Sequence, residues 1–458
     1  MRNTDDSKFT PVTTVLDNLG DIKLSNEQQK VFDLLENTSK NYFITGKAGT
    51  GKSVLLSYFV AHTMKNVAVL APTGVAALNV AGQTLHSFYM MSPAFQNVLI
   101  DKERHRLRSD TKRAIKRLDA IVIDEISMVR SDVITMVDAK MRYARRSHRP
   151  FGGCQGILFG DPYQLEPIEI KDDDELSVFR SQYRGNFFFE TKTYEHAEVE
   201  CHELSSVYRQ DDAEDIAILN RLRSGERSDE LVELINSRCC GKTLPDDTEC
   251  IMLAARNSEV NYANTTGLAA LSGDEHVYVG RLEGSMKESD CNTPLVLRLK
   301  VGAQVMMTKN DAADSDEGSK GGRWVNGTLA TVTGLTDYSI TVRIGEHEHV
   351  VRPVTWDKCG FVEDYDAEAQ GMVLKRVTVG KFEQFPVKLA YAITVHKSQG
   401  QTYDRVRIDL GASGAFAKGQ TYVALSRCRS LAELYLERPL RPSDISVSPK
   451  VVDFMAGM

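Results

Sequence analysis

The sequence predicts an α/β protein built on a mostly parallel sheet with helices on both faces. Short apolar runs recur in the first half of the chain and have the length of buried strands. Segments with helical spacing alternate with these runs, as in consecutive strand–helix–strand units. The chain has 458 residues, which at roughly 150 residues per domain predicts about three domains. The runs cover residues 42–45, 67–71, 120–123 and 156–159.

The first helix and a later β-rich region can also be placed. Ser25 is a suitable N-cap for a helix over residues 26–37, whose apolar side chains recur with helical spacing. Residues 329–332 and 338–344 alternate as strands do and follow a stretch rich in Gly and Asp. A β-rich insertion is therefore expected over residues 311–385, inside a second α/β region.

Composition excludes several classes of protein. The hydrophobic content of 42% and charged content of 26% are ordinary for a globular chain and exclude collagen-like or wholly disordered sequences. The apolar runs are too short to span a membrane, and the polar N-terminus predicts no secretory signal. Eight cysteines without a CxxC pair favour reduced thiols in an intracellular protein. The net charge of −7 does not exclude a nucleic-acid partner, because local charge decides such binding.

The strongest motif is a phosphate-binding loop at residues 46–53, GKAGTGKS. It follows a predicted strand and precedes a predicted helix, as a P-loop requires. Its glycines let backbone N–H groups surround phosphates, and the start of the helix adds a positive dipole. Lys52 is expected to reach the β- and γ-phosphates of a nucleotide, and Ser53 to bind Mg²⁺.

Two further motifs supply partners for such a loop. Asp124 and Glu125 follow an apolar strand, so the first can bind Mg²⁺ and the second can orient or deprotonate water. Gln164 follows the next strand and can contact a γ-phosphate, although a turn-capping amide explains it equally well. Hydrolysis also requires positive charge at the phosphoryl group. Arg209 and Arg427 are candidates, but their spacing alone does not select them.

Ten motifs in order resemble the Pif-type DNA helicases of superfamily one, with RecD-like and Dda-like helicases as nearby relatives. The resemblance extends from about residue 24 to about residue 440. The 71–88 motif and the pair 392–400 and 423–427 are specific in combination. The motifs are 24–28 (LSNEQ), 46–53 (GKAGTGKS), 71–88 (APTGVAALNVAGQTLHSF), 124–128 (DEISM), 160–167 (GDPYQLEP), 208–210 (YRQ), 299–307 (LKVGAQVMM), 324–327 (WVNG), 392–400 (AITVHKSQG) and 423–427 (VALSR).

The resemblance implies an ATP-dependent DNA helicase that moves 5′ to 3′ on single-stranded DNA and unwinds duplex or forked DNA. ATP and Mg²⁺ would bind in a cleft between two RecA-like motor domains, with Arg209 and Arg427 as fingers from the second domain. A monomer is expected as the motor unit, without a membrane partner, in the cytoplasm or nucleoid, or in the nucleus or mitochondrion of a eukaryote. Residues implied at the nucleotide are Gln28 (adenine), Gly46, Gly49, Thr50, Gly51, Lys52, Ser53, Asp124, Glu125, Gln164 and Gly400.

The resemblance also implies a DNA track and a domain plan. Hydroxyl, imidazole and ammonium groups of two motifs would contact phosphates, and for Phe88 stacking on a base and packing in the core are equal alternatives; the other track residues are Thr73, Thr84, His86, His396, Lys397 and Ser398. The expected plan is a flexible leader (1–23), a first motor domain (24–205) with a small wedge insertion near 89–112, and a second motor domain (206–310 and 386–445). The β-rich insertion at 311–385 would be an SH3-like β-barrel. For the basic stretch within 88–118, a solvated helix face remains an equal alternative.

Two other functions are weighed against a helicase. A P-loop switch or GTPase would need an Asn-Lys-x-Asp motif, which Thr308-Lys-Asn-Asp311 does not match. A single-strand-binding protein with a vestigial ATPase site is disfavoured because the expected nucleotide-site residues are all present. The rate of ATP hydrolysis with and without single-stranded DNA separates the three.

Overall fold

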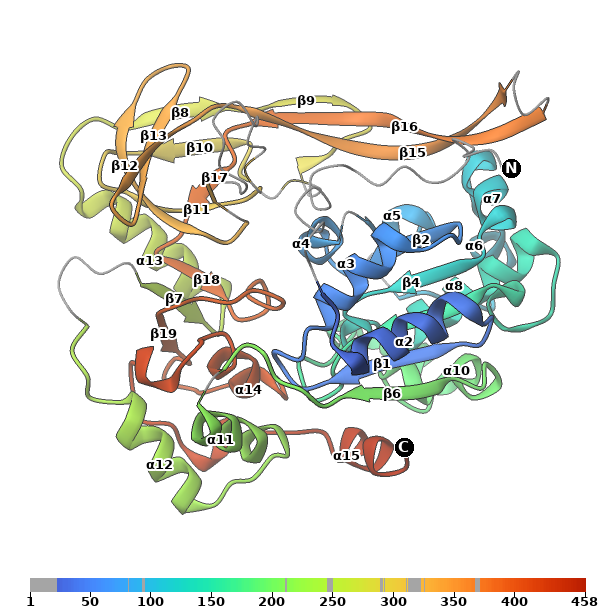
Figure 1. Cartoon of the computed structure of the whole chain (residues 1–458), viewed down its shortest axis with the longest axis horizontal. Coiled ribbons are helices and arrows are strands. Elements are labelled where there is room, and N and C mark those ends of the chain that lie inside the picture. Colours follow the sequence, from blue (N-terminus) through green and yellow to red (C-terminus); the bar gives the residue numbers. More distant parts are fainter. Residues whose placement is uncertain are drawn as a thin grey trace. The chain divides into compact units, whose positions relative to one another are not determined.

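The computed structural model describes residues 23–80, 82–92, 95–210, 212–244, 250–288, 291, 293–309, 311, 323, 324, 326–366 and 371–458. The expected leader, residues 1–23, lies outside this part of the chain except for Lys23. The described residues form two compact units (Figure 1). The first unit contains the described residues up to Val207 together with Cys359–Thr378 and Asp453–Met458, and the second contains Tyr208–Lys358 and Val379–Val452.

The first unit is built on a six-stranded sheet in the order β3-β2-β4-β5-β1-β6. All five strand pairs are parallel. The prediction of a parallel sheet is confirmed, and each of the four apolar runs forms a strand. The bounds are β1 Tyr42–Gly46, β2 Val67–Ala71, β3 Gln83–Thr84, β4 Ala120–Ile123, β5 Gln155–Phe159 and β6 Glu200–Leu204.

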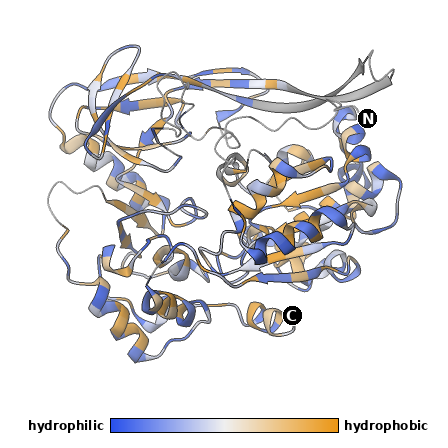
Figure 2. Cartoon of the chain, in the orientation of Figure 1, coloured by the Kyte–Doolittle hydropathy of each residue, from blue (hydrophilic) through white to orange (hydrophobic). Residues whose placement is uncertain are grey.

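Both faces of this sheet are covered, which explains why its strands are continuously apolar. Successive side chains of a strand point to opposite faces. Phe43 of β1 therefore packs in one core cluster, whereas Tyr42 and Ile44 pack in another. The strands β2 and β4 accordingly appear hydrophobic in Figure 2.

The helices of the first unit connect these strands. The longest are α2 Asn26–Asn37, α3 Lys52–His62 and α8 Ser131–Arg145. Helix α2 begins as predicted, because the Ser25 side chain accepts a hydrogen bond from the Gln28 N–H and closes a capping box with it. The other helices are α4 Gly74–Asn79, α5 Leu85–Phe88, α6 Asp101–His105, α7 Ser109–Arg117, α9 Asp173–Gln182, α10 Lys192–His196 and the C-terminal α15 Pro449–Ala456, whose last residues belong to this unit.

The second unit contains a smaller parallel sheet in the order β18-β7-β19-β20. Its three strand pairs are parallel. The strands are β7 Ile251–Ala254, β18 Ala392–Thr394, β19 Val406–Asp409 and β20 Leu434–Leu436, and the helices of this unit are α11 Ala213–Arg223, α12 Asp229–Cys239, α13 Asn257–Ala270 and α14 Gln420–Leu425.

The remainder of the second unit is antiparallel. Five strands pair in the order β14-β13-β12-β11-β17 around a separate core cluster. Strands β11 and β17 lie outside the expected insertion 311–385, so this sheet uses chain on both sides of that range. The bounds are β8 His276–Val279, β9 Arg281–Gly284, β10 Val296–Leu299, β11 Gln304–Met307, β12 Leu329–Leu335, β13 Ile340–Ile344, β14 His347–Val351, β15 Val354–Asp366, β16 Gly371–Gln384 and β17 Val387–Leu389. The parts of β15 and β16 that fall within Cys359–Thr378 belong to the first unit.

The antiparallel strands also change the expected character of residues 206–310. That range was expected to continue the second α/β region, yet β8 pairs with β10 and β9 pairs with β16, in both cases antiparallel. Their short alternation of exposed and buried side chains gives a weaker sequence signal than a buried parallel strand does. No helix within the described ranges is long and apolar enough to cross a membrane.

Candidate nucleotide and DNA sites

The phosphate-binding loop connects β1 to α3 in the first unit. Gly46, Gly49 and Gly51 all have positive φ, at 149°, 85° and 77°. A side chain at Gly46 is also excluded by space, because a Cβ there would lie 2.7 Å from the carbonyl oxygen of Leu204 and from Thr50 Oγ1. These glycines are therefore required by the backbone path of the loop.

Lys52, the first residue of α3, folds back over this loop. Its Nζ donates hydrogen bonds to the carbonyl oxygens of Gly46 at 2.6 Å and Lys47 at 3.0 Å. Ser53 follows at the exposed first turn of the helix. The ammonium group is thus held at the loop, and the hydroxyl group is open to solvent.

Asp124 and Glu125 lie directly after β4. The Asp124 carboxylate accepts a hydrogen bond from the Glu125 N–H at 2.9 Å. Burial, followed by the charge of Glu125, raises the pKa of Asp124 to about 7, whereas the charge of Lys52 lowers it. Asp124 and the lysine of the loop are therefore close enough to interact electrostatically. Glu125 has a φ of 49°, uncommon for a residue with a side chain and frequent at functional sites.

Gln164 lies in the turn after β5. The N–H of Gly160 donates to the carbonyl oxygen of Ile44 in β1, which fixes the start of this turn beside the strand that leads to the loop. Gln164 is buried, and its Nε2 donates to Asp161 Oδ2 at a long 3.5 Å. The amide is therefore near the same edge of the sheet, in weak contact with a carboxylate.

Gln28 connects α2 to the phosphate loop. Its Oε1 accepts a hydrogen bond from the Ser25 N–H at 3.1 Å, and its Nε2 donates to the carbonyl oxygen of Gly51 at 3.4 Å. The side chain is buried. The structure thus places Gln28 against the loop; its contact with adenine stays a prediction.

Arg209 and Arg427 meet at Ser426 in the second unit. Arg209 Nη1 donates to the Ser426 carbonyl oxygen at 3.0 Å, and Arg427 Nη2 donates to Ser426 Oγ at 2.8 Å. Arg427 is only 1% exposed, and it also donates hydrogen bonds to the carbonyl oxygens of Val423 and Gln401. Residues 209 and 426 are distant in the chain, so the sequence gives no sign that Ser426 is the shared partner of the two arginines.

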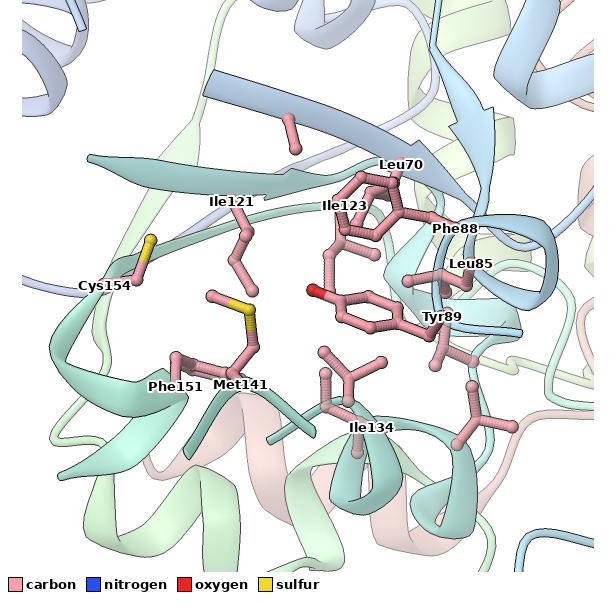
Figure 3. Packing of buried hydrophobic residues seen from close by; sticks show 14 of the residues in the cluster. Leu70, Leu85, Phe88, Tyr89, Ile121, Ile123, Ile134, Met141, Phe151 and Cys154 are labelled. Carbon is pink, nitrogen blue, oxygen red and sulfur yellow. The ribbon is translucent and has the colours of Figure 1, made fainter. Parts of the chain in front are cut away.

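The DNA-track residues of the first unit divide into partly buried and buried groups. Thr73 and Thr84 accept hydrogen bonds from the N–H groups of Ala76 and Ser87, so each hydroxyl caps a helix start. His86 is partly buried, and burial lowers its pKa. Of the two alternatives for Phe88, this structure favours core packing, because the ring is 2% exposed and packs against core residues such as Leu70 and Leu85 (Figure 3).

The DNA-track residues of the second unit follow β18. Lys397 is exposed and His396 is partly buried. Ser398 is fully buried, and its Oγ donates to the Val395 carbonyl oxygen at 2.8 Å, so the predicted phosphate contact would require this hydroxyl to become exposed. Gly400, expected at the nucleotide, has a φ of 80° in the same turn.

These features define an α/β protein with a P-loop between a parallel strand and a helix. A model of the PIF1-like helicase family matches residues 23–233. The ATP-dependent DNA helicase Pif1 of Bdellovibrio bacteriovorus is 32% identical over 440 residues, which cover 95% of this chain and 92% of that protein. The chain therefore belongs to the PIF1-like helicase family, and the resemblance found in the sequence is confirmed.

Other relatives support the assignment. The ATP-dependent DNA helicase PIF1 of Mus musculus is 33% identical over 95% of this chain, which spans only 63% of the mouse protein. A crystal structure of Bacteroides sp Pif1 in complex with ADP-AlF4 matches with a TM-score of 0.82 and 31% identity, covering 95% of this chain and 97% of that one. A crystal structure of Bacteroides Pif1 bound to ssDNA has a TM-score of 0.70 and 31% identity, with the same coverage.

Proposed function

We propose that this chain is an ATP-dependent DNA helicase that moves 5′ to 3′ on single-stranded DNA and unwinds duplex or forked DNA. The observation that carries the proposal is the convergence of Lys52 and Asp124 at one edge of the parallel sheet, where the charge of one changes the pKa of the other. The relatives add support, since a Bacteroides Pif1 was solved with ADP-AlF4 and another with ssDNA.

The proposed chemistry follows from the positions of the side chains. On ATP binding, the ammonium of Lys52 would exchange its two carbonyl acceptors for the β- and γ-phosphate oxygens, which carry more negative charge. Glu125 would orient the attacking water or accept its proton, and the Gln164 amide would contact the γ-phosphate. Each of these groups lies at or near the edge where the strands of the first sheet end.

The residues present fit a magnesium ion. Asp124 is a buried carboxyl whose pKa is raised, so a divalent cation beside it would favour the ionised form. In the described part of the chain no group of three or more His, Cys, Asp and Glu residues could enclose a metal. A magnesium ion held by Asp124 and Ser53 would therefore take its other ligands from phosphates and water, as is usual for this ion, and would neutralise phosphate charge.

The two arginines are proposed to stabilise the transferring phosphoryl group. Arg427 and Arg209 now bond to acceptors within the second unit, so the role requires their guanidinium groups to share or exchange these acceptors when ATP is bound. Since both contact Ser426, their positions depend on one another.

The domain roles are likewise proposals. The two parallel sheets support two RecA-like motor domains, and the five-stranded antiparallel sheet supports an SH3-like insertion around residues 311–385. The short helix α6 lies within the proposed wedge near residues 89–112. We propose the monomer as the motor unit, although one related structure describes unwinding of forked dsDNA by two coordinating Pif1 helicases.

Two assays test the proposal. ATP hydrolysis should rise at least tenfold on addition of single-stranded DNA, and duplexes with a 5′ tail should be unwound whereas duplexes with only a 3′ tail should not. A switch protein would show little stimulation by DNA, and a single-strand-binding protein with a vestigial site would bind DNA without turnover. Unwinding that requires a 3′ tail would contradict the polarity.

A further inference from the structure

Phe416 is a phenylalanine held at the surface of the second unit. It lies in the segment between β19 and α14, and its side chain is 58% exposed. An exposed apolar residue by itself requires no explanation. The contacts around this ring distinguish it from a surface residue whose side chain is not held in place.

Two side chains support the ring. The imidazole of His396 lies nearly parallel to it, with an interplanar angle of 19° and ring centroids 6.1 Å apart. The guanidinium carbon of Arg256 lies 5.2 Å from the centroid of the Phe416 ring, within the range of a cation–π contact. His396 belongs to the motif already proposed to contact DNA, and exposed Lys397 follows it.

The backbone of the segment is also fixed. The N–H groups of Phe416 and Ala417 both donate to Gln420 Oε1, at 3.0 Å and 3.4 Å. The fully buried Gln420 in turn donates from Nε2 to the carbonyl oxygen of Ala255, the residue before Arg256. The amide of Gln420 thus ties the ring-bearing segment to the arginine that supports the ring.

Such an arrangement matches a stacking platform for a nucleic-acid base. Proteins that bind single strands without reading sequence combine exposed aromatic rings with nearby cations, since every base presents a π-face. Holding the ring in advance lowers the conformational entropy lost on binding. Burial lowers the pKa of His396, so its imidazole is neutral near pH 7.5 and adds no repulsion toward Arg256.

We propose that Phe416, supported by His396 and Arg256, stacks on a base of single-stranded DNA bound to the second unit. This inference rests on the proposed function, and assigns to Phe416 the role that the sequence suggested for Phe88. Stacking requires a base, whereas the ionic contacts of a strand do not.

The test compares a 12-nucleotide oligothymidine with an abasic strand of the same length and charge, by fluorescence anisotropy. For Phe416→Ala we expect affinity for oligothymidine to fall about 5- to 100-fold and affinity for the abasic strand to stay within about twofold. Phe416→Trp should restore binding of oligothymidine. The matched control is Tyr338→Ala, which removes another exposed aromatic side chain of the second unit and should change neither affinity.

Different failures have different meanings. An unchanged affinity of Phe416→Ala for oligothymidine, or an equal loss on both strands, overturns the stacking role while leaving the helicase proposal intact. Wild-type protein that binds neither strand, with ATP hydrolysis unaffected by DNA, overturns both. Thermal melting of Phe416→Ala establishes that any loss is not unfolding, since the removed ring is largely exposed.

Discussion

The two parallel sheets of this molecule leave their functional side chains in opposite states. In the first unit, the end of the sheet contains glycines with positive φ, a lysine whose ammonium group donates to two backbone carbonyl oxygens, and a carboxyl whose pKa is raised by burial. In the second unit, Arg427 is buried with acceptors for its guanidinium nitrogens, and an aromatic ring is exposed. A similar sheet can therefore present either a buried carboxyl whose ionisation a cation would favour or a buried guanidinium group already paired with neighbouring acceptors.

The largest expected effect tests the first unit. Lys52→Ala removes the ammonium group from the phosphate loop, and ATP hydrolysis should fall by at least about 10²–10³-fold. Binding of single-stranded DNA without nucleotide should stay within about twofold, because the DNA-track residues are elsewhere. Steady-state hydrolysis and anisotropy measure the two effects. Exposed Lys30→Ala on α2 is the control, and ATP-driven unwinding by Lys52→Ala would refute the assigned role.

The next effect tests the satisfied arginine of the second unit. Arg427→Lys keeps a positive charge but cannot reproduce bonds to Val423, Gln401 and Ser426, so turnover at saturating ATP should fall at least about 10²-fold. Nucleotide affinity should change only severalfold. Arg429→Lys, at an exposed ion pair with Asp404, should behave as wild type. Weakened nucleotide binding with normal turnover would count against a finger role.

The raised pKa of Asp124 predicts a pH-dependent stability for the first unit. Folded protein keeps the proton on Asp124 up to about pH 7, whereas the unfolded chain loses it near the ordinary value of 3.8. The unfolded state binds fewer protons in this window, so Asp124 lowers stability as pH rises from about 4 to 7. Asp124→Asn removes this pH dependence. The free energy of unfolding of the variant, relative to wild type, should therefore rise by roughly 1–3 kcal/mol from pH 5 to pH 8.

Denaturant unfolding without magnesium or nucleotide measures this difference. The exposed substitution Asp33→Asn on α2 provides the comparison for general effects of removing a carboxylate. If the stability difference between Asp124→Asn and wild type is the same at pH 5 and pH 8, the raised pKa is not a property of the folded protein.

The smallest expected effect concerns the residue that joins the two arginines. Ser426→Ala removes the Oγ acceptor of Arg427 but keeps the backbone oxygen that Arg209 contacts. Turnover should fall about 3- to 10-fold, equivalent to one hydrogen bond, with the KM for ATP within about twofold. Ser237→Ala on the exposed side of α12 serves as control. Unchanged turnover would show that the serine does not position Arg427.

The parts of the fold predicted from sequence are those set by local patterns. Strands β2 and β4 and helix α2 have the predicted bounds, because continuous apolar runs and a capping serine act over a few residues. The phosphate loop is equally local, since its glycines are dictated by backbone conformation. Pairing of β11 with β12 and β17 joins distant segments and left no comparable signal.

The two phenylalanines show where sequence reasoning about the site ended. Phe88 lies in a motif shared with DNA helicases, yet it packs in the core of the first unit; Phe416 lies near another such motif and is exposed. The residue type is the same in both cases. Burial depends on which elements fold over a side chain, and this information is tertiary.

The side-chain amide of Gln28 contacts two different elements, so a substitution at this residue affects both. Its oxygen helps to begin α2, while its nitrogen contacts the loop at Gly51. Truncation to alanine would therefore fray a helix and release a loop together, and the two losses would be inseparable. Gln28→Glu retains an oxygen for Ser25 but replaces the donor to Gly51 with a negatively charged acceptor, so it disturbs the loop contact while keeping the capping box.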